Sequence, residues 1–152
     1  MDKKIITKSG KETKKMGEDL ARWICSGQVK ENRKSAVVIG LSGNLGGGKT
    51  TFLQGFAKGL GIKEKILSPT FVILKHFKIT NQKFTDFYHI DCYRLKTHED
   101  ILELNFENII LNPKNIVAIE WPEKIKKVLP KNLMEISFKF VDENKREISF
   151  EV

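Results

Sequence analysis

The glycine-rich segment at residues 43–50 constrains the fold more than any other part of the chain. It reads GNLGGGKT and satisfies the pattern G-x-x-x-x-G-K-[ST]. A short apolar segment, 36–41, precedes it, and apolar residues at helical spacing follow from Lys49 onward. A strand, a glycine-rich loop and a helix in this order form a phosphate-binding loop, or P-loop. The sequence therefore predicts an α/β fold, with residues 1–152 forming a single P-loop domain in which helices flank a mixed sheet.

Each residue type in this segment suits the binding of a nucleoside triphosphate. Glycines let backbone N–H groups turn inward around the β-phosphate, and the start of the following helix adds partial positive charge. Lys49 is predicted to reach the β- and γ-phosphates, and Thr50 to present its hydroxyl to Mg²⁺. A glycine-rich turn without a ligand is the alternative interpretation. The predicted nucleotide-binding residues of this segment are Gly43, Asn44, Leu45, Gly46, Gly47, Gly48, Lys49, Thr50 and Thr51.

The other elements are predicted from hydrophobic periodicity and turn residues. Ser9 and Glu12 have the spacing of a capping box, ahead of a helix that Gly27 ends. A second helix runs from Lys49 to a stop at Gly61. Further predictions are a hairpin of 71–79 with 84–92, a short helix at 97–104, a strand at 116–119, a short helix between Pro122 and Pro130, and a closing hairpin of 134–141 with 147–152.

Two carboxylates each follow an apolar strand. They are Asp91, after 87–90, and Glu120, after 116–119. A P-loop protein needs an acid near Mg²⁺, and Glu120 follows the cleaner apolar run, so we expect it to hold the ion through its water shell. Asp91 then positions or activates the attacking water. The predicted catalytic residues are Asp91, Glu120 and Lys49, and the predicted metal ligands are Thr50 and Glu120. A surface ion pair at a strand end is the alternative for either acid.

Composition limits the partners and the compartment. The formal net charge of +8 favours an acidic partner such as RNA, although a solvated lysine-rich surface is the alternative because no aromatic residues interleave with the N-terminal lysines. Cys25 and Cys92 lack metal-ligand spacing and indicate a reducing compartment. The N-terminus lacks a signal sequence and no apolar run reaches membrane length. We therefore expect a cytoplasmic protein with no membrane partner.

Three further features are assigned no role in catalysis. Residues 144–147 read NKRE and partly match the guanine reader N-K-x-D, but they fall in a predicted hairpin turn and carry Glu in place of Asp. His89 alternates with its neighbours as an ordinary buried strand residue does. Trp121 is expected to pack in the core, with packing under the site or a partner surface as alternatives.

Four segments together resemble the TsaE family of small bacterial ATPases: GNLGGGKTT at 43–51, SPTF at 68–71, HIDCYRL at 89–95 and IEWPE at 119–123. The order and spacing match over nearly the whole chain. The resemblance implies a cytoplasmic ATPase that uses ATP and Mg²⁺ and is needed for threonylcarbamoyladenosine, the modified base beside the anticodon of tRNAs that read codons beginning with adenosine. It implies TsaD, which transfers the threonylcarbamoyl group, and TsaB as protein partners, with tRNA an indirect partner.

The resemblance also implies residue roles. Lys49 and Thr50 would hold phosphate and Mg²⁺, Glu120 would complete the metal site and Asp91 would act in hydrolysis. It further implies a switch-like loop formed by Ser68, Pro69, Thr70 and Phe71. In this loop Thr70 would sense the γ-phosphate.

The adenine pocket is expected between Lys11–Thr13, Thr13 in particular, and the closing hairpin near Arg146. The chain departs from the family in two places, with Asn44 where Asp is common and Gly47 where Ala is common. Neither change removes a backbone donor to phosphate, so Asn44 bears on catalytic rate more than on binding.

Two other functions remain as alternatives. A small-molecule kinase also uses a P-loop, but it needs a lid and an acceptor pocket for which this chain has little room. In a nucleotide-controlled binding module, ATP only shifts a loop between partner-binding states. Phosphate transfer to an added acceptor separates the first from an ATPase, whereas slow hydrolysis that rises only with partners fits both the second and an ATPase.

Overall fold

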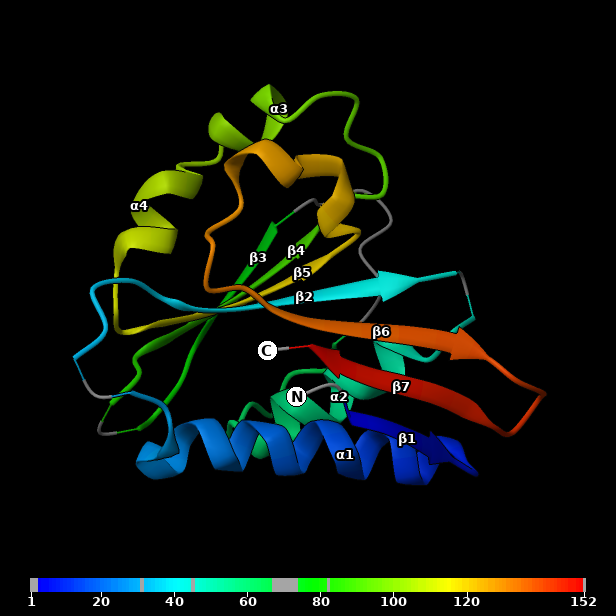
Figure 1. The fold of residues 1–152 in the computed structure, drawn as a ribbon. Helices are drawn as coiled ribbons and strands as arrows, with labels where there is room; N and C mark the ends of the chain where they lie inside the picture. The colour runs from blue at the N-terminus through cyan, green and yellow to red at the C-terminus, as the bar shows by residue number, and fades with distance from the viewer. Residues whose placement is uncertain (1–2, 31, 45, 67–73, 82, 152) are drawn as a thin grey trace.

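The computed structural model describes residues 3–30, 32–44, 46–66, 74–81 and 83–151. These residues form a mixed sheet with strand order β1-β7-β6-β2-β5-β4-β3 (Figure 1). The strands are β1 (Lys3–Thr7), β2 (Val37–Gly43), β3 (Leu74–Lys78), β4 (Asp86–Asp91), β5 (Asn115–Glu120), β6 (Met134–Phe140) and β7 (Arg146–Glu151). The predicted α/β fold with a mixed sheet flanked by helices is confirmed.

The centre of the sheet is parallel and its margins are antiparallel. Strand β2 runs parallel to both β5 and β6, and β5 runs parallel to β4. The hairpin strands β3 and β4, and β6 and β7, pair antiparallel, as does β1 with β7. Because parallel strands end at the same edge, the carboxyl ends of β2, β4 and β5 meet there, which is where α/β proteins place their ligands.

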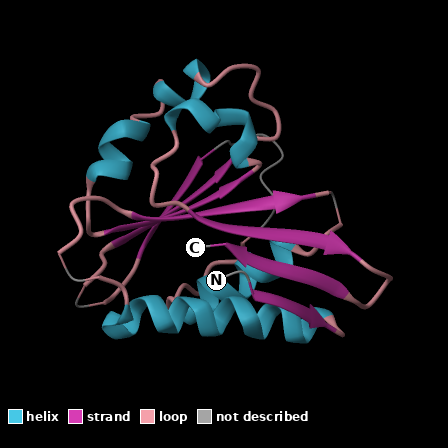
Figure 2. Cartoon of the chain, viewed as in Figure 1, coloured by secondary structure: helices cyan, strands magenta, loops and turns pink. Residues whose placement is uncertain are grey.

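Helices cover both faces of the sheet (Figure 2). One face carries α1 (Gly10–Trp23), which continues as the π-helical turn Ile24–Gln28, and α2 (Lys49–Gly59). The other face carries α3 (Glu99–Leu102), α4 (Phe106–Leu111) and the 3₁₀ turn Pro122–Val128. A buried apolar cluster lies on each side, so the sheet is covered by a core on both faces.

The predicted start and end of the first helix are confirmed. Ser9 Oγ accepts a hydrogen bond from the Glu12 N–H at 3.1 Å, and Glu12 Oε2 accepts one from the Lys8 N–H at 2.6 Å. The glutamate thus reaches one residue further back than in the usual capping box, but two otherwise unpaired donors are still satisfied. Gly27 adopts a φ of +89°, which turns the chain out of the helix.

Helices α1 and α2 touch backbone to backbone. A Cβ atom on Gly17 of α1 would overlap the carbonyl oxygen of Phe52, and a Cβ atom on Gly55 of α2 would overlap that of Lys14. Only glycine permits this approach. The N-terminal turn of α1 is thereby fixed beside the first turn of α2, and hence beside the P-loop.

The structure corrects three expectations. Residues 3–7 form the edge strand β1, although the sequence predicted no strand in this lysine-rich stretch. Residues 106–111 form α4, which was not predicted, and the helix expected over 97–104 is limited to Glu99–Leu102. Both hairpins are confirmed for the described residues, whereas the expected strand residues 71–73 lie outside them.

Candidate functional site

The predicted P-loop, residues 43–50, connects the last residue of β2, Gly43, to the first residue of α2, Lys49. Gly43, Gly46 and Gly48 have φ angles of +127°, +78° and +99°, a region that residues with a Cβ atom rarely adopt. The Gly47 N–H donates to the Asn44 carbonyl at 3.0 Å, which tightens the turn. The glycines predicted to shape a phosphate cradle are therefore placed where their backbone freedom is used.

Lys49 is buried at the base of this loop. Its Nζ donates a hydrogen bond to the Gly43 carbonyl and lies 4.0 Å from the centre of the Trp121 ring. Burial lowers the pKa of Lys49, while the nearby charges of Glu120, Glu123 and Asp91 act in the opposite direction. The ammonium is thus held in a partly dehydrated position, where a phosphate would interact with it strongly. Trp121 is half-buried and packs against the apolar core, as expected, and its ring also contacts Lys49.

Asp91 and Glu120 are direct neighbours in the sheet. They pair across β4 and β5 at the carboxyl ends of both strands, and the Cys92 N–H donates to the Glu120 carbonyl at 3.0 Å. Glu120 is buried, whereas Asp91 is half-buried and its Oδ1 accepts a hydrogen bond from the Tyr93 N–H at 2.9 Å. Burial raises the pKa of Asp91, and the charge of Glu120 adds to this effect. The predicted acids therefore lie together, near Lys49.

His89 completes this group, although the sequence indicated no role for it. Its Nε2 lies 2.8 Å from Glu120 Oε2, and both side chains are buried. Its Nδ1 is buried and has no hydrogen-bond partner among the described residues. His89 stands two residues before Asp91, so the period-two alternation of a strand places both on one face of the sheet. That alternation is the signal that could have identified it.

A small cleft of about 90 Å³ lies next to the P-loop, beside Gly48 and Thr51. It is lined by Thr13, Gly48, Thr51 and Arg146, so four residues expected to bind nucleotide, from three distant parts of the chain, are brought together. Thr13 is buried, and its hydroxyl lies 2.7 Å from that of Thr7 on β1. The further lining residues are Gly10, Glu143 and Asn144.

Arg146 links the closing hairpin to the P-loop. Its Nε donates to the Gly46 carbonyl at 3.0 Å, its Nη1 donates to the Asp142 carbonyl at 2.5 Å, and its guanidinium lies 4.7 Å from the centre of the Phe140 ring. Residues 141–145 form the predicted turn, closed by a hydrogen bond from Val141 N–H to the Lys145 carbonyl. Asn144, discounted as a guanine reader, nonetheless lines the cleft.

The remaining predicted site residues divide into two groups. Thr50 is half-buried in the first turn of α2, and Asn44 is exposed. Leu45, Ser68, Pro69, Thr70 and Phe71 lie outside the described residues, so the expected switch-like loop remains a prediction. Within the described ranges, no three His, Cys, Asp or Glu side chains are grouped so that they could hold a metal ion by themselves. None of the helices formed by the described residues has the length and apolar character needed to cross a membrane.

Comparison with known families identifies the chain. The model of the family described as "Threonylcarbamoyl adenosine biosynthesis protein TsaE" matches residues 7–148, which include the P-loop, both acids and Arg146. The chain belongs to the TsaE family. The resemblance inferred from the four sequence segments is therefore confirmed.

Individual TsaE proteins and one crystal structure show the same likeness. The chain is 40% identical over 143 residues to TsaE of Rickettsia felis, an alignment covering 93% of this chain and 75% of that protein. It is 36% identical over 135 residues to TsaE of Treponema pallidum, covering 87% and 93%. The crystal structure of YdiB from Bacillus subtilis superposes with a TM-score of 0.75 at 29% identity, covering 99% of this chain and 84% of that one.

Proposed function

We propose that this TsaE family member is a Mg²⁺-dependent ATPase, carried by one P-loop domain, which acts with TsaD and TsaB in forming threonylcarbamoyladenosine in tRNA. The observation that carries the proposal is the meeting of Lys49, Asp91 and Glu120 at the carboxyl ends of the parallel strands beside a P-loop. Family membership supports the role in tRNA modification. The arrangement of the three charged groups supports Mg²⁺-dependent hydrolysis of ATP.

The P-loop and Lys49 would bind the triphosphate. The positive φ angles at Gly46 and Gly48 open the backbone for inward-facing N–H groups at the start of α2. On binding, the Lys49 ammonium would exchange its contact with the Gly43 carbonyl for the β- and γ-phosphate oxygens. The base and ribose would then lie toward the cleft lined by Thr13, Thr51 and Arg146.

Thr50 and Glu120 are the residues that would hold Mg²⁺, which supplies positive charge beside the β- and γ-phosphates when bound. A hydroxyl and a carboxylate are the hard oxygen donors that this ion prefers. The lack of a three-residue acidic cluster in the described ranges also fits, since Mg²⁺ is usually held by one or two protein groups together with waters and substrate phosphates. His89 orients Glu120 by its hydrogen bond to Oε2.

Asp91 would position the attacking water. Its Oδ1 is held by the Tyr93 N–H, and its raised pKa makes it a better proton acceptor than an exposed aspartate. Water attacks the γ-phosphorus, the bond to the bridging oxygen of ADP breaks, and the proton of the water passes to Asp91. Lys49 stabilises the charge that develops on the phosphate oxygens.

Measurement of ATP hydrolysis with Mg²⁺ tests the proposal, with and without TsaB, TsaD and tRNA. We expect the rate to increase with the partners and to fall at least about a hundredfold in Glu120→Ala. Glu107→Ala removes an exposed carboxylate of α4 and is the matched control, with an expected rate near that of the wild type. Calorimetric titration with ATP reports binding separately. Tight ATP binding without hydrolysis, and without any effect of the partners, would contradict the ATPase mechanism.

A further inference from the structure

A second pocket lies at the opposite edge of the sheet from the P-loop. It is formed where the chain enters the parallel strands, by Arg33 ahead of β2, Phe84 ahead of β4, and Pro113 and Lys114 ahead of β5. Gly27 and Lys83 complete the polar part of its lining, and its volume is about 300 Å³. The part of the lining that the structure describes contains three cationic side chains and no carboxylate. Such a concentration of positive charge in a concave site favours an anion.

Arg33 is held in a defined orientation in this pocket. Its Nη2 donates to the Pro113 carbonyl at 2.9 Å, and its guanidinium lies 4.8 Å from the centre of the Phe84 ring. These two contacts fix the plane of the guanidinium. Its Nε is nevertheless buried and makes no hydrogen bond within the described part of the chain. A buried donor without a partner is unfavourable, and a small movement of the side chain that lets an anion in the pocket accept from Nε would remove that cost.

We propose that this pocket is an anion site that binds a phosphate group, with Arg33 as its principal donor and the exposed Lys114 as a second cation. A guanidinium presents N–H groups in a planar fork that two phosphate oxygens can accept from, and the exposed Lys114 adds a second positive charge. The ring of Phe84 and the side chains of Ile24 and Val29 form an apolar wall that suits an organic group attached to the phosphate. The phosphate belongs either to a small phosphate ester or to the backbone of an RNA.

The pocket is independent of the proposed nucleotide site. The P-loop lies at the carboxyl ends of the parallel strands, and this pocket lies at their amino ends. A phosphate bound at each site would therefore be detected by different backbone amides. Those of Gly46–Gly48 report on the P-loop, and those of Gly27 and Lys114 report on the pocket.

The test is an NMR titration of the ¹⁵N-labelled protein with inorganic phosphate and, separately, with tRNA. We expect the Gly27 and Lys114 amides to shift saturably. The dissociation constant derived from them should rise at least about tenfold in Arg33→Gln, because a charge-assisted hydrogen bond is lost. Lys34→Gln removes the same charge from the neighbouring exposed residue and should leave the constant unchanged.

The two probes separate the sources of the phosphate. Shifts of the pocket amides with both probes assign the site to an RNA backbone, and shifts with inorganic phosphate alone assign it to a small ester. No saturable shift with either probe, or equal affinity in Arg33→Gln and the wild type, overturns the proposal. Lys114→Gln provides a second variant if Arg33→Gln is unstable, with an expected affinity loss of about threefold. If the P-loop does not bind phosphate, only the Gly46–Gly48 amides will fail to shift. The shifts of the Gly27 and Lys114 amides would still report on the pocket.

Discussion

His89 Nε2 lies 2.8 Å from Glu120 Oε2, with the two side chains only 1% and 3% exposed. Removing the imidazole would leave a carboxylate buried without this partner, which is among the most costly single changes in a protein core. We expect His89→Ala to lower the free energy of unfolding by about 3 kcal/mol. Urea denaturation of the wild type and the variant measures this difference in the free energy of unfolding.

A double-mutant cycle with Glu120→Gln separates the pair from the general loss of packing. Because the two groups are in contact, we expect a coupling free energy of about 1–3 kcal/mol. Strictly additive effects of the two substitutions would show that the hydrogen bond does not stabilise the fold.

Arg146 is expected to support nucleotide binding through the backbone of the P-loop. Arg146→Ala removes the donor to the Gly46 carbonyl and one wall of the cleft beside Gly48. We expect the dissociation constant for ATP to rise about tenfold, which corresponds to the loss of one charge-assisted hydrogen bond. Lys145→Ala changes the charge equally in the same turn and is the control. Equal weakening in both variants would indicate a general electrostatic effect in place of a specific contact.

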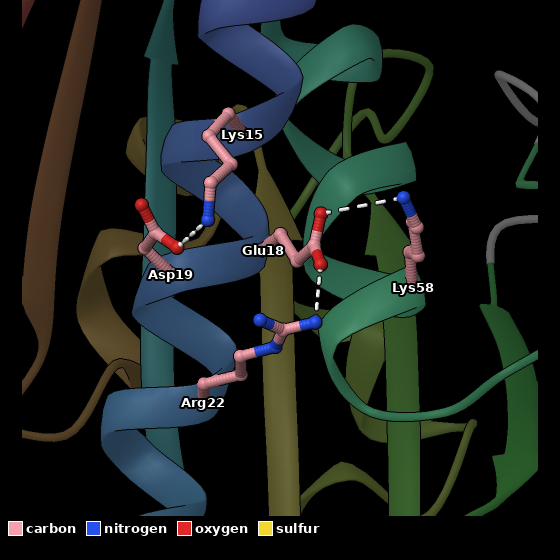
Figure 3. A network of polar contacts seen from close by, with 5 residues as sticks. All are labelled: Lys15, Glu18, Asp19, Arg22 and Lys58. Carbon is pink, nitrogen blue, oxygen red and sulfur yellow. Dashed lines mark hydrogen bonds and ion pairs between the residues drawn. The ribbon is translucent and has the colours of Figure 1, made fainter.

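Glu18 and Asp19 offer a comparison of a buried and an exposed carboxylate, each paired with exposed cations (Figure 3). Glu18 Oε1 lies 2.5 Å from Arg22 Nη2 and its Oε2 lies 3.5 Å from Lys58 Nζ of α2, with 9% of the Glu18 side chain exposed. Asp19 pairs with Lys15 of the same helix and is 57% exposed. We expect Glu18→Ala to lower the free energy of unfolding by about 2 kcal/mol and Asp19→Ala by about 0.5 kcal/mol or less. Thermal and urea unfolding of both variants measure the difference, and equal losses would contradict it.

Asp86 is expected to contribute to stability in a pH-dependent way. Burial alone raises the pKa of Asp86, but hydrogen bonds from Lys78, Thr85 and His76 outweigh it and lower the pKa from 3.8 to about 2. A folded-state pKa below the unfolded value gives stability that is complete above about pH 4 and is lost as the pH falls toward about 2. We expect the stability difference between the wild type and Asp86→Asn to shrink by about 1 kcal/mol between about pH 6 and about pH 3. A difference independent of pH would contradict the assignment.

Local patterns predicted the P-loop and the elements around it because the signals lie within a few residues of one another. Examples of such local signals are the capping residues Ser9 and Glu12 and the apolar run before Glu120. The strand at residues 3–7 was missed because lysines obscure its alternation and because its partner, β7, lies at the far end of the chain. The contact of Arg146 with Gly46 spans 100 residues and depends on the order of strands in the sheet, which no local pattern specifies.

The candidate site, too, could be predicted from local patterns only in part. Asp91 and Glu120 could each be proposed from the ends of apolar strands, but their pairing follows from the adjacency of β4 and β5. The hydrogen bond of His89 to Glu120 requires that adjacency as well. Asn144 was read as an ordinary turn residue, which it is, and its place in the cleft follows from where the hairpin packs.

The backbone contact between α1 and α2 determines how the candidate site responds to a ligand. With no side chain between Gly17 and Phe52 or between Gly55 and Lys14, the two helices cannot tilt against each other without atomic overlap. We therefore expect Thr13 on α1 and Gly48 at the start of α2 to keep their alignment when a nucleotide binds. The site is preorganised on this side, so binding free energy is not spent on assembling it. If ATP binding changes the conformation, we expect the change in parts of the molecule other than this helix pair.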